Sequence, residues 1–291
     1  MAVYRIKLFT QKEGVHAEGK DQQYCLERNR FAIGWGLPNI SDFEKYKNEI
    51  LNSDNIDINR GLEYSLQYIE AINENDYVWT QLDGRKYLLG KVKGKIFFDN
   101  ERYRIGPCLN VTDWKLIDFD LVPGKIISCL VSFGPTLQVL SVDNTFEKYC
   151  EWLYTGNKDD ILHIDNIKSL LHYDDLEDLL GLYLQDKYEY YIIPSTNKQS
   201  TKLIEYELRD KSGNKACVQC KIGNSKVKIK DIRDVFPKNE YKIFICTLCE
   251  FKDSYWDENI EKIPVEELID WAKNHTFLLP ERIKQYLQFM F

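Results

Sequence analysis

The sequence has no long apolar run and no excess of positive charge. The longest candidate run, residues 243–249, has only the length of a strand, so we expect no membrane-spanning segment. The formal net charge of −7 excludes a general electrostatic affinity for nucleic acid. Any contact with nucleic acid must therefore come from local basic patches.

We also expect no secretory leader, because residues 1–7 are charged and resemble a strand. We therefore expect a soluble, cytoplasmic protein. Its 291 residues and ordinary apolar content indicate two domains, each able to bury a core.

Eight cysteines are present, and four of them form two C-x-x-C pairs, Cys217 with Cys220 and Cys246 with Cys249. Such pairs can mark a zinc ribbon. Both pairs, however, lie in apolar sequence typical of strand interiors, where the two members point to opposite faces. We favour buried, reduced cysteines, with a zinc site as the alternative. The others have no motif spacing: Cys25, Cys108, Cys129 and Cys150.

Residues 203–221 are predicted to form two strands joined by a tight turn. Residues 211–214 have turn chemistry, with Gly213 supplying a positive φ. An odd-numbered, bulged loop would place Glu205 on the same face as Gln219 and Lys221, whereas a two-residue loop would place it beside Cys220. We predict the odd-numbered loop, because it gives the hairpin one polar face and one apolar face. The apolar face would hold Ile204, Tyr206, Leu208, Val218 and Cys220.

The polar face of this hairpin has the groups that metal-dependent phosphodiester cleavage requires. Carboxylate and carbonyl oxygens bind Mg²⁺ or Mn²⁺, and a lysine can place the attacking water. Glu177, on a helix predicted over residues 167–184, either completes this metal site or is one acid of a solvated helix face. A solvated hairpin face rich in Glu, Gln and Lys is also common on protein surfaces. An ordinary surface role, without chemistry, is therefore the alternative for these residues.

The segment Val218-Gln219-Cys220-Lys221-Ile222-Gly223 resembles the second hairpin strand of Mrr-like PD-(D/E)XK restriction endonucleases, which has a Q-x-K motif. An acidic helix precedes that hairpin in the family, and residues 174–180 resemble it. Glu205 stands where the family has an aspartate, a departure that bears on catalysis. The resemblance implies catalytic roles for Glu205, Gln219 and Lys221. It also implies metal binding by Glu205, Gln219 and Glu177.

A basic run follows the hairpin and has two interpretations. In a nuclease it would contact the phosphate backbone. Otherwise it is a solvated strand face. The residues are Lys226, Lys228, Lys230 and Arg233, of which the three lysines are the candidate phosphate contacts.

The first half is predicted to be rich in strands, with two helices inserted early. The helices are expected over residues 43–51 and 62–73 and a hairpin around Asp83-Gly84. Further strands are expected over residues 3–8, 31–36, 95–98, 102–105, 112–117 and 125–133. A polar loop containing Glu18, Asp21 and Gln22 is expected after the first of them. A short helix at 146–152 and a linker at 155–160 would follow. This order suggests a small barrel.

Three segments of this half resemble the PUA-like superfamily, which includes the EVE and YTH readers. They are Gly34-Trp35-Gly36, Asn75-Asp76-Tyr77-Val78-Trp79 and Tyr87-Leu88-Leu89-Gly90-Lys91-Val92. The resemblance implies a flipped, modified base held in an aromatic pocket. The candidate walls are Trp35, Trp79 and Trp114, and the alternative is that each is a core residue. Trp35 is favoured, because the glycines on both sides of it would let a planar ligand approach the backbone.

Together these patterns predict an α+β chain of two domains. Residues 1–154 would form a PUA-like β-barrel with inserted helices, and residues 161–291 an α/β restriction-endonuclease-like sandwich. The predicted function is a modification-dependent, type IV-like restriction endonuclease acting in phage defence. It would bind DNA with modified bases and hydrolyse it with Mg²⁺ or Mn²⁺, and double-strand cleavage would favour a homodimer. The alternatives are a catalytically inactive nucleic-acid reader and a zinc-stapled interaction protein.

Overall fold

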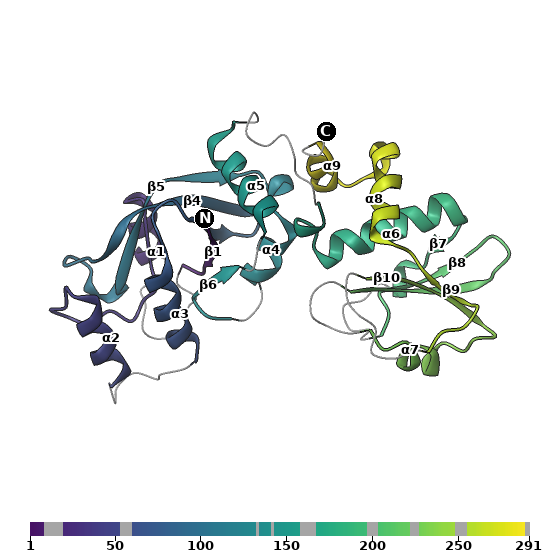
Figure 1. Cartoon of the computed structure of the whole chain (residues 1–291), viewed down its shortest axis with the longest axis horizontal. Helices are drawn as coiled ribbons and strands as arrows, with labels where there is room; N and C mark the ends of the chain where they lie inside the picture. The colour runs from purple at the N-terminus through teal and green to yellow at the C-terminus, as the bar shows by residue number, and fades with distance from the viewer. Residues whose placement is uncertain are drawn as a thin grey trace. The chain divides into compact units, whose positions relative to one another are not determined.

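The computed structural model describes residues 1–8, 20–52, 60–131, 134–140, 143–157, 167–196, 203–221, 227–247 and 255–288. They divide into two compact units, Met1–Leu170 and Leu171–Gln288. Both units combine a sheet with helices, as expected for an α+β chain of two domains (Figure 1). The assignment of residues 1–154 to a reader domain and of residues 161–291 to a nuclease domain stays a prediction.

The first unit is built on a six-stranded sheet with the order β2-β5-β4-β3-β1-β6. Strand β1 is parallel to β3, and the other neighbouring pairs are antiparallel. The predicted hairpin around Asp83-Gly84 is confirmed, because β3 and β4 pair on either side of it. The strands are β1 Val3–Ile6, β2 Arg30–Ala32, β3 Tyr77–Asp83, β4 Lys86–Phe98, β5 Pro107–Ile117 and β6 Leu137–Leu140.

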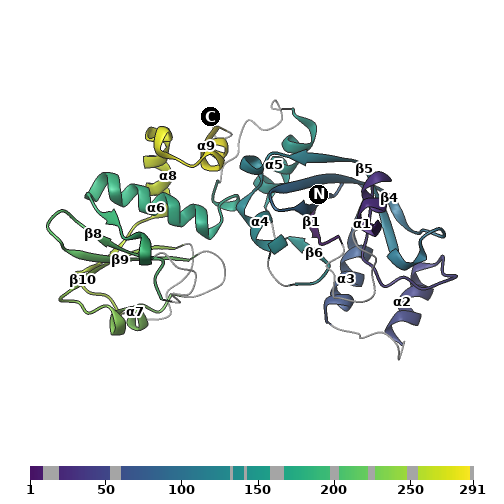
Figure 2. The same cartoon turned by 180° about the vertical axis from the view of Figure 1, so that it is seen from behind.

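The expected closed barrel is not found in the described part of this unit, because β2 and β6 are the two edges of an open sheet. Helices α2 and α3 lie on one side of the sheet and α5 on the other (Figures 1 and 2). On the side of α2 and α3, residues such as Tyr46, Ile50 and Leu66 are buried against Tyr4 and Val78 of the sheet. The helices are α1 Lys20–Glu27, α2 Phe43–Leu51, α3 Arg60–Ala71, α4 Gly124–Val131 and α5 Asn144–Thr155, with short 3-10 turns η1 Tyr103–Ile105, η2 Phe119–Leu121 and η4 Ile167–Ser169.

Three local predictions for this unit are wrong. The strand expected over residues 125–133 is helix α4 where the structure describes it, because Val122, Ile126 and Leu130 are buried at four-residue spacing. The strand expected over residues 102–105 contains η1, and the polar loop expected around Asp21 contains α1. In each case the residues that pack against the sheet decide the local structure, against the intrinsic preference of the segment.

The second unit contains a five-stranded sheet with the order β11-β10-β9-β8-β7. Strands β7, β8 and β9 are antiparallel neighbours, and β9, β10 and β11 are parallel. Helices α6 and α8 lie on one face of the sheet and α7 on the other (Figure 1). The elements are α6 Tyr173–Tyr188, β7 Tyr191–Ile192, η5 Pro194–Thr196, β8 Tyr206–Arg209, β9 Lys215–Lys221, α7 Ile229–Val235, β10 Tyr241–Thr247, β11 Ile260–Lys262, α8 Val265–Asn274, η6 Thr276–Leu278 and α9 Glu281–Gln288.

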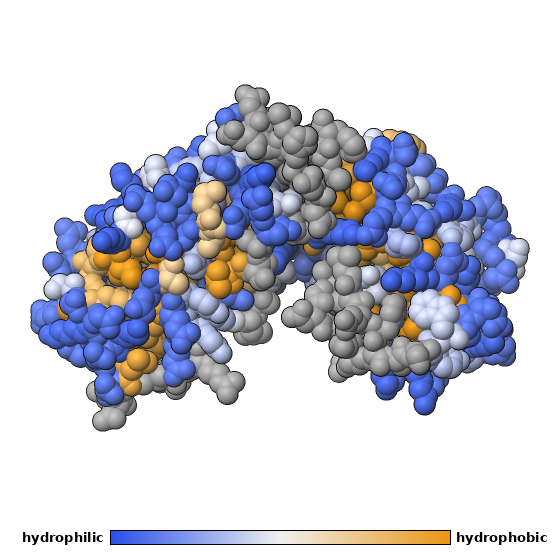
Figure 3. All heavy atoms as spheres, viewed as in Figure 1, coloured by the Kyte–Doolittle hydropathy of each residue, from blue (hydrophilic) through white to orange (hydrophobic). Residues whose placement is uncertain are grey.

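Along the chain, this unit runs in the order helix, strand, hairpin, helix, two strands and two helices. On the face drawn in Figure 3, hydrophilic residues cover most of both units and apolar residues show in small separate areas. Within the described residues, no helix combines the length and apolar character needed to cross a membrane.

Candidate functional site

The turn between β8 and β9 has the odd number of residues that the sequence predicts. Arg209 pairs with Lys215, so residues 210–214 form the loop. The Asp210 carboxylate accepts the backbone N–H groups of Ser212 at 2.9 Å and Asn214 at 2.8 Å. Gly213 has a φ of +86°, which a residue without a Cβ adopts without strain. The side-chain contacts of this loop therefore fix the register of the hairpin.

This register brings Glu205, Gln219 and Lys221 together. The Gln219 side chain donates Nε2–H to Glu205 Oε1 at 2.5 Å, and the same nitrogen donates to the Cys220 carbonyl at 2.9 Å. The Lys221 ammonium lies 3.9 Å from the same Glu205 oxygen. The acid, the amide and the ammonium therefore converge on one point.

The hairpin does not have the open polar face that was expected. Gln219 is 3% exposed, and Cys217 on the same face is fully buried with residues of α7 and β10. Ile204 belongs to this cluster and not to the opposite face, because the regular strand begins only at Tyr206. Helices cover both faces of β9, so the polar groups meet at its carboxyl end. In sheets with parallel strands, this is the edge at which ligands usually bind.

Glu177 of α6, for which the sequence left open a metal ligand or an acid of a solvated helix face, lies beside Glu205. Its carboxyl group shares a hydrogen bond with that of Glu205. The Tyr206 hydroxyl donates to the Glu177 carbonyl at 3.0 Å and ties α6 to β8 at this point. The helix begins with a capping box in which His172 accepts a backbone N–H, which gives His172 a structural role.

The surroundings of the two carboxyl groups disfavour their charged forms. Burial, followed by the negative charge of Glu205, raises the pKa of Glu177 to about 8. Burial also raises the pKa of Glu205, although Lys221 acts in the opposite direction. The pair therefore holds a proton at neutral pH.

A divalent cation fits this pair of acids, because it would replace the shared proton and relieve the repulsion. Glu177 and Glu205 offer the hard carboxylate oxygens that Mg²⁺ prefers. The side-chain N–H groups of Gln219 are engaged with Glu205 and with the Cys220 carbonyl, so Gln219 orients Glu205. Any metal contact of Gln219 would have to use a carbonyl oxygen. Over the described ranges, no group of three or more His, Cys, Asp or Glu residues could hold a metal ion.

The basic run after β9 is only partly described. Lys226 lies outside the described residues. Lys228 is the residue before α7 and pairs with Asp231 at 2.6 Å, and Lys230 lies on α7 and is exposed. Where it is described, the run therefore continues into a helix and is not a continuous strand face.

The three candidate tryptophans do not line one pocket. Trp79 is fully buried and donates its indole N–H to the Cys150 sulfur on α5 at 3.4 Å. Its neighbour Val78 belongs to the core on the opposite face. A buried ring of this kind presents no surface on which a base could stack.

Trp35 and Trp114, in contrast, are half-buried and pack against the same core cluster. Trp35 has a φ of +55°, and the Tyr46 hydroxyl donates to its carbonyl at 3.0 Å. A Cβ at Gly90 would lie 2.9 Å from the Trp114 ring, so this glycine lets the indole lie against β4. The indole N–H of Trp114 is buried and has no hydrogen-bond partner among the residues that the structure describes.

The glycines beside Trp35 serve a different purpose from the one expected. A Cβ at Gly36 would come within 1.6 Å of the Tyr103 carbonyl oxygen, and one at Gly106 within 2.0 Å of the Gly34 carbonyl oxygen. Two segments of the chain itself, and not a planar ligand, therefore approach the backbone here. They hold the loop that carries Trp35.

The described cysteines of the two C-x-x-C pairs are buried, as expected for core residues. Those described are free, and Cys217, Cys220 and Cys246 are buried. Burial raises the pKa of Cys217 to about 12, which opposes the thiolate that a metal requires. Cys249 lies outside the described residues.

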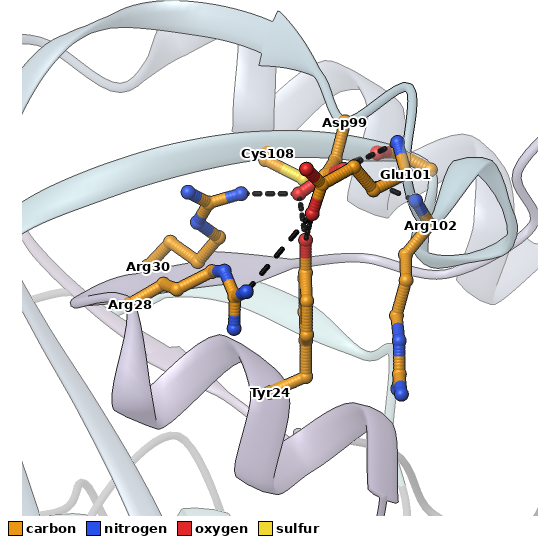
Figure 4. A network of polar contacts seen from close by, with 8 residues as sticks. Tyr24, Arg28, Arg30, Asp99, Glu101, Arg102 and Cys108 are labelled. Atoms are coloured by element: carbon orange, nitrogen blue, oxygen red, sulfur yellow. Dashed lines mark hydrogen bonds and ion pairs between the residues drawn. The ribbon is translucent and has the colours of Figure 1, made fainter.

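Sequence reasoning missed an arginine network around Tyr24 (Figure 4). Arg28 and Arg102 stack on the Tyr24 ring, 4.0 and 4.5 Å from its centre. The Tyr24 hydroxyl donates to Asp99 at 2.6 Å, and Arg30 pairs with the same carboxylate. No sequence pattern could have found this network, because its members come from two distant segments, residues 24–30 and 99–102, without a common motif.

Comparisons with known proteins identify no family for this chain. No protein-family model matches the sequence, and no curated protein matches it. Among solved structures, the chain is similar to the MspJI restriction endonuclease in complex with a 27-mer oligonucleotide. That match has a TM-score of 0.24 and 10% identity, and it covers 92% of this chain and 74% of that one. A TM-score of this size does not establish a shared fold.

Proposed function

We propose that this chain is a modification-dependent, type IV-like restriction endonuclease. Its second unit would be a PD-(D/E)XK nuclease domain that hydrolyses DNA with Mg²⁺ or Mn²⁺. The observation that carries this proposal is the convergence of Glu177, Glu205, Gln219 and Lys221 at the carboxyl end of β9. Two acids with raised pKa values beside a lysine form an arrangement more typical of a functional site than of a solvated surface.

Each residue of this cluster has a role that follows from its contacts. Glu205 and Glu177 would hold the metal, which lowers the pKa of a bound water and neutralises charge on the phosphate. Gln219 fixes the Glu205 carboxylate through its 2.5 Å hydrogen bond. The Lys221 side chain is 37% exposed, so its ammonium can donate to a phosphate oxygen or to the attacking water.

The first unit would read the modified base. Trp35 and Trp114 are the aromatic candidates that remain, because both reach the surface from one core cluster. Stacking on an aromatic ring compensates for the stacking that a flipped base loses. The phage-defence role, DNA as the partner and a homodimer belong to the same proposal.

The test is cleavage of matched DNA duplexes containing plain, methylated or hydroxymethylated bases, with Mg²⁺, with Mn²⁺ or with chelator. We expect metal-dependent cleavage of a modified duplex only. Lys221→Ala should lower the rate at least about 100-fold, since it removes a group that stabilises the transition state. Lys215→Ala is the matched control, because Lys215 lies at the far end of β9 and pairs with Glu240 at 3.4 Å. Equal rates for the two variants would remove the catalytic claim.

The second candidate function is a catalytically inactive nucleic-acid reader. The observation in its favour is that Gln219, Glu205 and Lys221 already satisfy one another without a metal. A reader would bind modified DNA as tightly as the nuclease. A reader would not bind Mn²⁺ through Glu205. If calorimetry shows a heat of Mn²⁺ binding that disappears in Glu205→Gln, this second candidate function is excluded.

A further inference from the structure

Two lysines of the first unit lie over aromatic rings and not beside acids. The Lys91 ammonium is 5.7 Å from the centre of the Tyr77 ring, and the Lys115 ammonium is 4.9 Å from the centre of the Tyr154 ring. Among the residues that the structure describes, no acid forms an ion pair with either lysine. A ring face attracts an ammonium through its quadrupole and does not neutralise its charge.

A lysine over a ring in the second unit has different surroundings. The Lys187 ammonium is 4.9 Å from the centre of the Tyr183 ring, and it also forms an ion pair with Glu267 at 2.6 Å. There, a carboxylate of the same fold matches the charge. Within the described residues, the charges of Lys91 and Lys115 have no such match, so they remain open to an anion from another molecule.

The strand period places both lysines on one face of the first sheet. Their chain neighbours Val92 and Trp114 belong to the core cluster on the side of α2 and α3. Successive strand residues point to opposite faces, so Lys91 and Lys115 lie on the face of α5. Lys93 shares this face, because it stands two residues from Lys91 on β4, and it is exposed.

A row of hydrogen-bond donors continues from these lysines across the sheet. By register, Lys93 of β4 lies opposite Asn110 of β5, which lies opposite Arg30 of β2. All three side chains are at least partly exposed. Along the strands, this row lies between Cys108, which packs against α1, and Trp79, which packs against α5. The two helices therefore cover the ends of the face and leave the row between them.

Acids on this face offset only part of its positive charge. Asp99 pairs with Arg30. Asp113 accepts a tyrosine hydroxyl of α5. Burial, followed by the charge of Glu151, raises the pKa of Tyr77, so this acid also lies near the face. Three lysines face Asp113 and Glu151, and the face keeps a positive excess in a chain whose net charge is −7.

We propose that Lys91, Lys93, Lys115 and Asn110, with Arg30 at one end, form a surface that binds the phosphodiester backbone of DNA. Ammonium and guanidinium groups donate charge-assisted hydrogen bonds to phosphate oxygens, and the Asn110 amide adds a neutral donor. A net negative chain needs a local basic surface of this kind to bind nucleic acid at all.

This surface lies on the opposite face of the sheet from Trp35 and Trp114. Contacts with phosphates hold DNA without reading its bases, so binding here does not require a modified base. The choice of DNA rests on the proposed function, whereas the surface itself requires neither cleavage nor a metal.

The test is binding of an unmodified DNA duplex to the full chain, measured by fluorescence anisotropy in the presence of chelator. Lys91→Gln, Lys93→Gln and Lys115→Gln should each weaken binding about fivefold at about 0.1 M salt. The triple glutamine variant should reduce the slope of log affinity against log salt concentration by about 2.7, since each phosphate contact contributes about 0.9. A triple variant that binds as tightly as the parent would overturn the proposal.

Two controls separate the charge of these lysines from other effects. Lys45→Gln removes a lysine that is exposed on α2, on the other side of the sheet, and should bind DNA as the parent does. A triple arginine variant of Lys91, Lys93 and Lys115 keeps the charge and should bind within about twofold of the parent. An effect of Lys45→Gln as large as that of Lys93→Gln would contradict the assigned surface.

Chemical acetylation gives a second readout without any substitution. Bound DNA should protect Lys91, Lys93 and Lys115 from acetylation and leave Lys45 as reactive as in the free chain. Equal protection of Lys45 would contradict the surface. An RNA duplex that binds more tightly than the DNA duplex of the same sequence would overturn the choice of DNA.

The outcome is distinguishable from the outcome for the proposed nuclease. If the parent chain does not bind plain DNA, the surface is overturned, while Lys221→Ala on modified duplexes still decides the cleavage. If binding depends on the three lysines and no modified duplex is cut, the surface stands and the nuclease proposal fails.

Discussion

Arg5 in the first unit and Arg233 in the second are both buried, but their surroundings differ. Arg233 forms a bidentate ion pair with Asp257, in which both N···O distances are 2.9 Å. Its remaining nitrogen donates to the Phe236 and Tyr241 carbonyls. Arg5 shares a single amide oxygen between two of its nitrogens, and its third nitrogen has no partner within the described part of the chain. Two arginines of similar burial therefore differ in their hydrogen bonds. Among the described residues, every guanidinium nitrogen of Arg233 has a partner, whereas one nitrogen of Arg5 has none.

The carboxylates of the second unit show the same contrast. Burial disfavours the charge of Asp257, but hydrogen bonds from Arg233 and from the Asn259 backbone bring its pKa below the ordinary value. Glu177 is opposed by burial and by Glu205 together, and its pKa rises. A charge that the fold matches is structural, whereas an unmatched one indicates a place for a ligand of opposite sign.

The largest effect on stability is expected when one partner of a buried ion pair is removed. Arg233→Met should destabilise the second unit by about 3–5 kcal/mol, because it leaves Asp257 buried without its partner. The measurement is urea unfolding followed by hydrogen exchange in α7 and β10. Lys238→Met, which breaks the exposed Lys238–Glu258 pair at 2.8 Å, should leave the transition where it is. Equal effects from the two variants would break the comparison between matched and unmatched charges.

Metal binding should reveal the unmatched acids directly. Because the pKa of Glu177 is about 8, binding of Mn²⁺ at pH 7 should release about one proton. Affinity should therefore rise about tenfold per pH unit below pH 8 and level off above it. Calorimetry in two buffers of different ionisation enthalpy measures the released proton. A heat independent of the buffer, or proton release unchanged in Glu177→Gln, would contradict the site.

Much of the candidate site in the second unit could be predicted from the sequence. Its geometry depends on whether the loop between β8 and β9 has an odd or an even number of residues. Gly213 and Asp210 fix an odd-numbered loop, and the period of a strand then places Glu205, Gln219 and Lys221 together. The burial of Gln219 could not be predicted. Whether a helix covers the second face of a hairpin is decided by distant segments, here α7.

The first unit shows where local patterns fail. The β-branched, apolar residues of α4 favoured a strand, but burial at four-residue spacing selects a helix. Trp79 could not be distinguished from Trp35 by its neighbours, because its burial follows from the packing of α5. Arg5 stands in a strand-like segment, and only the fold shows that its NH1 group has no partner.

The smallest effect that we predict is a change in the pH dependence of stability. In the folded chain Glu177 keeps its proton up to about pH 8, while the ordinary value for glutamate is 4.5. Between these values the folded state binds a proton that the unfolded state has lost, so this residue lowers stability as pH rises through the window. Glu177→Gln removes the penalty, so the second unit should melt about 3 °C higher than the parent at pH 8.5 and equally at pH 4. Glu240→Gln is an exposed control that should follow the parent at both pH values, and a difference at pH 4 as large as at pH 8.5 would show that the effect does not come from an unmatched charge.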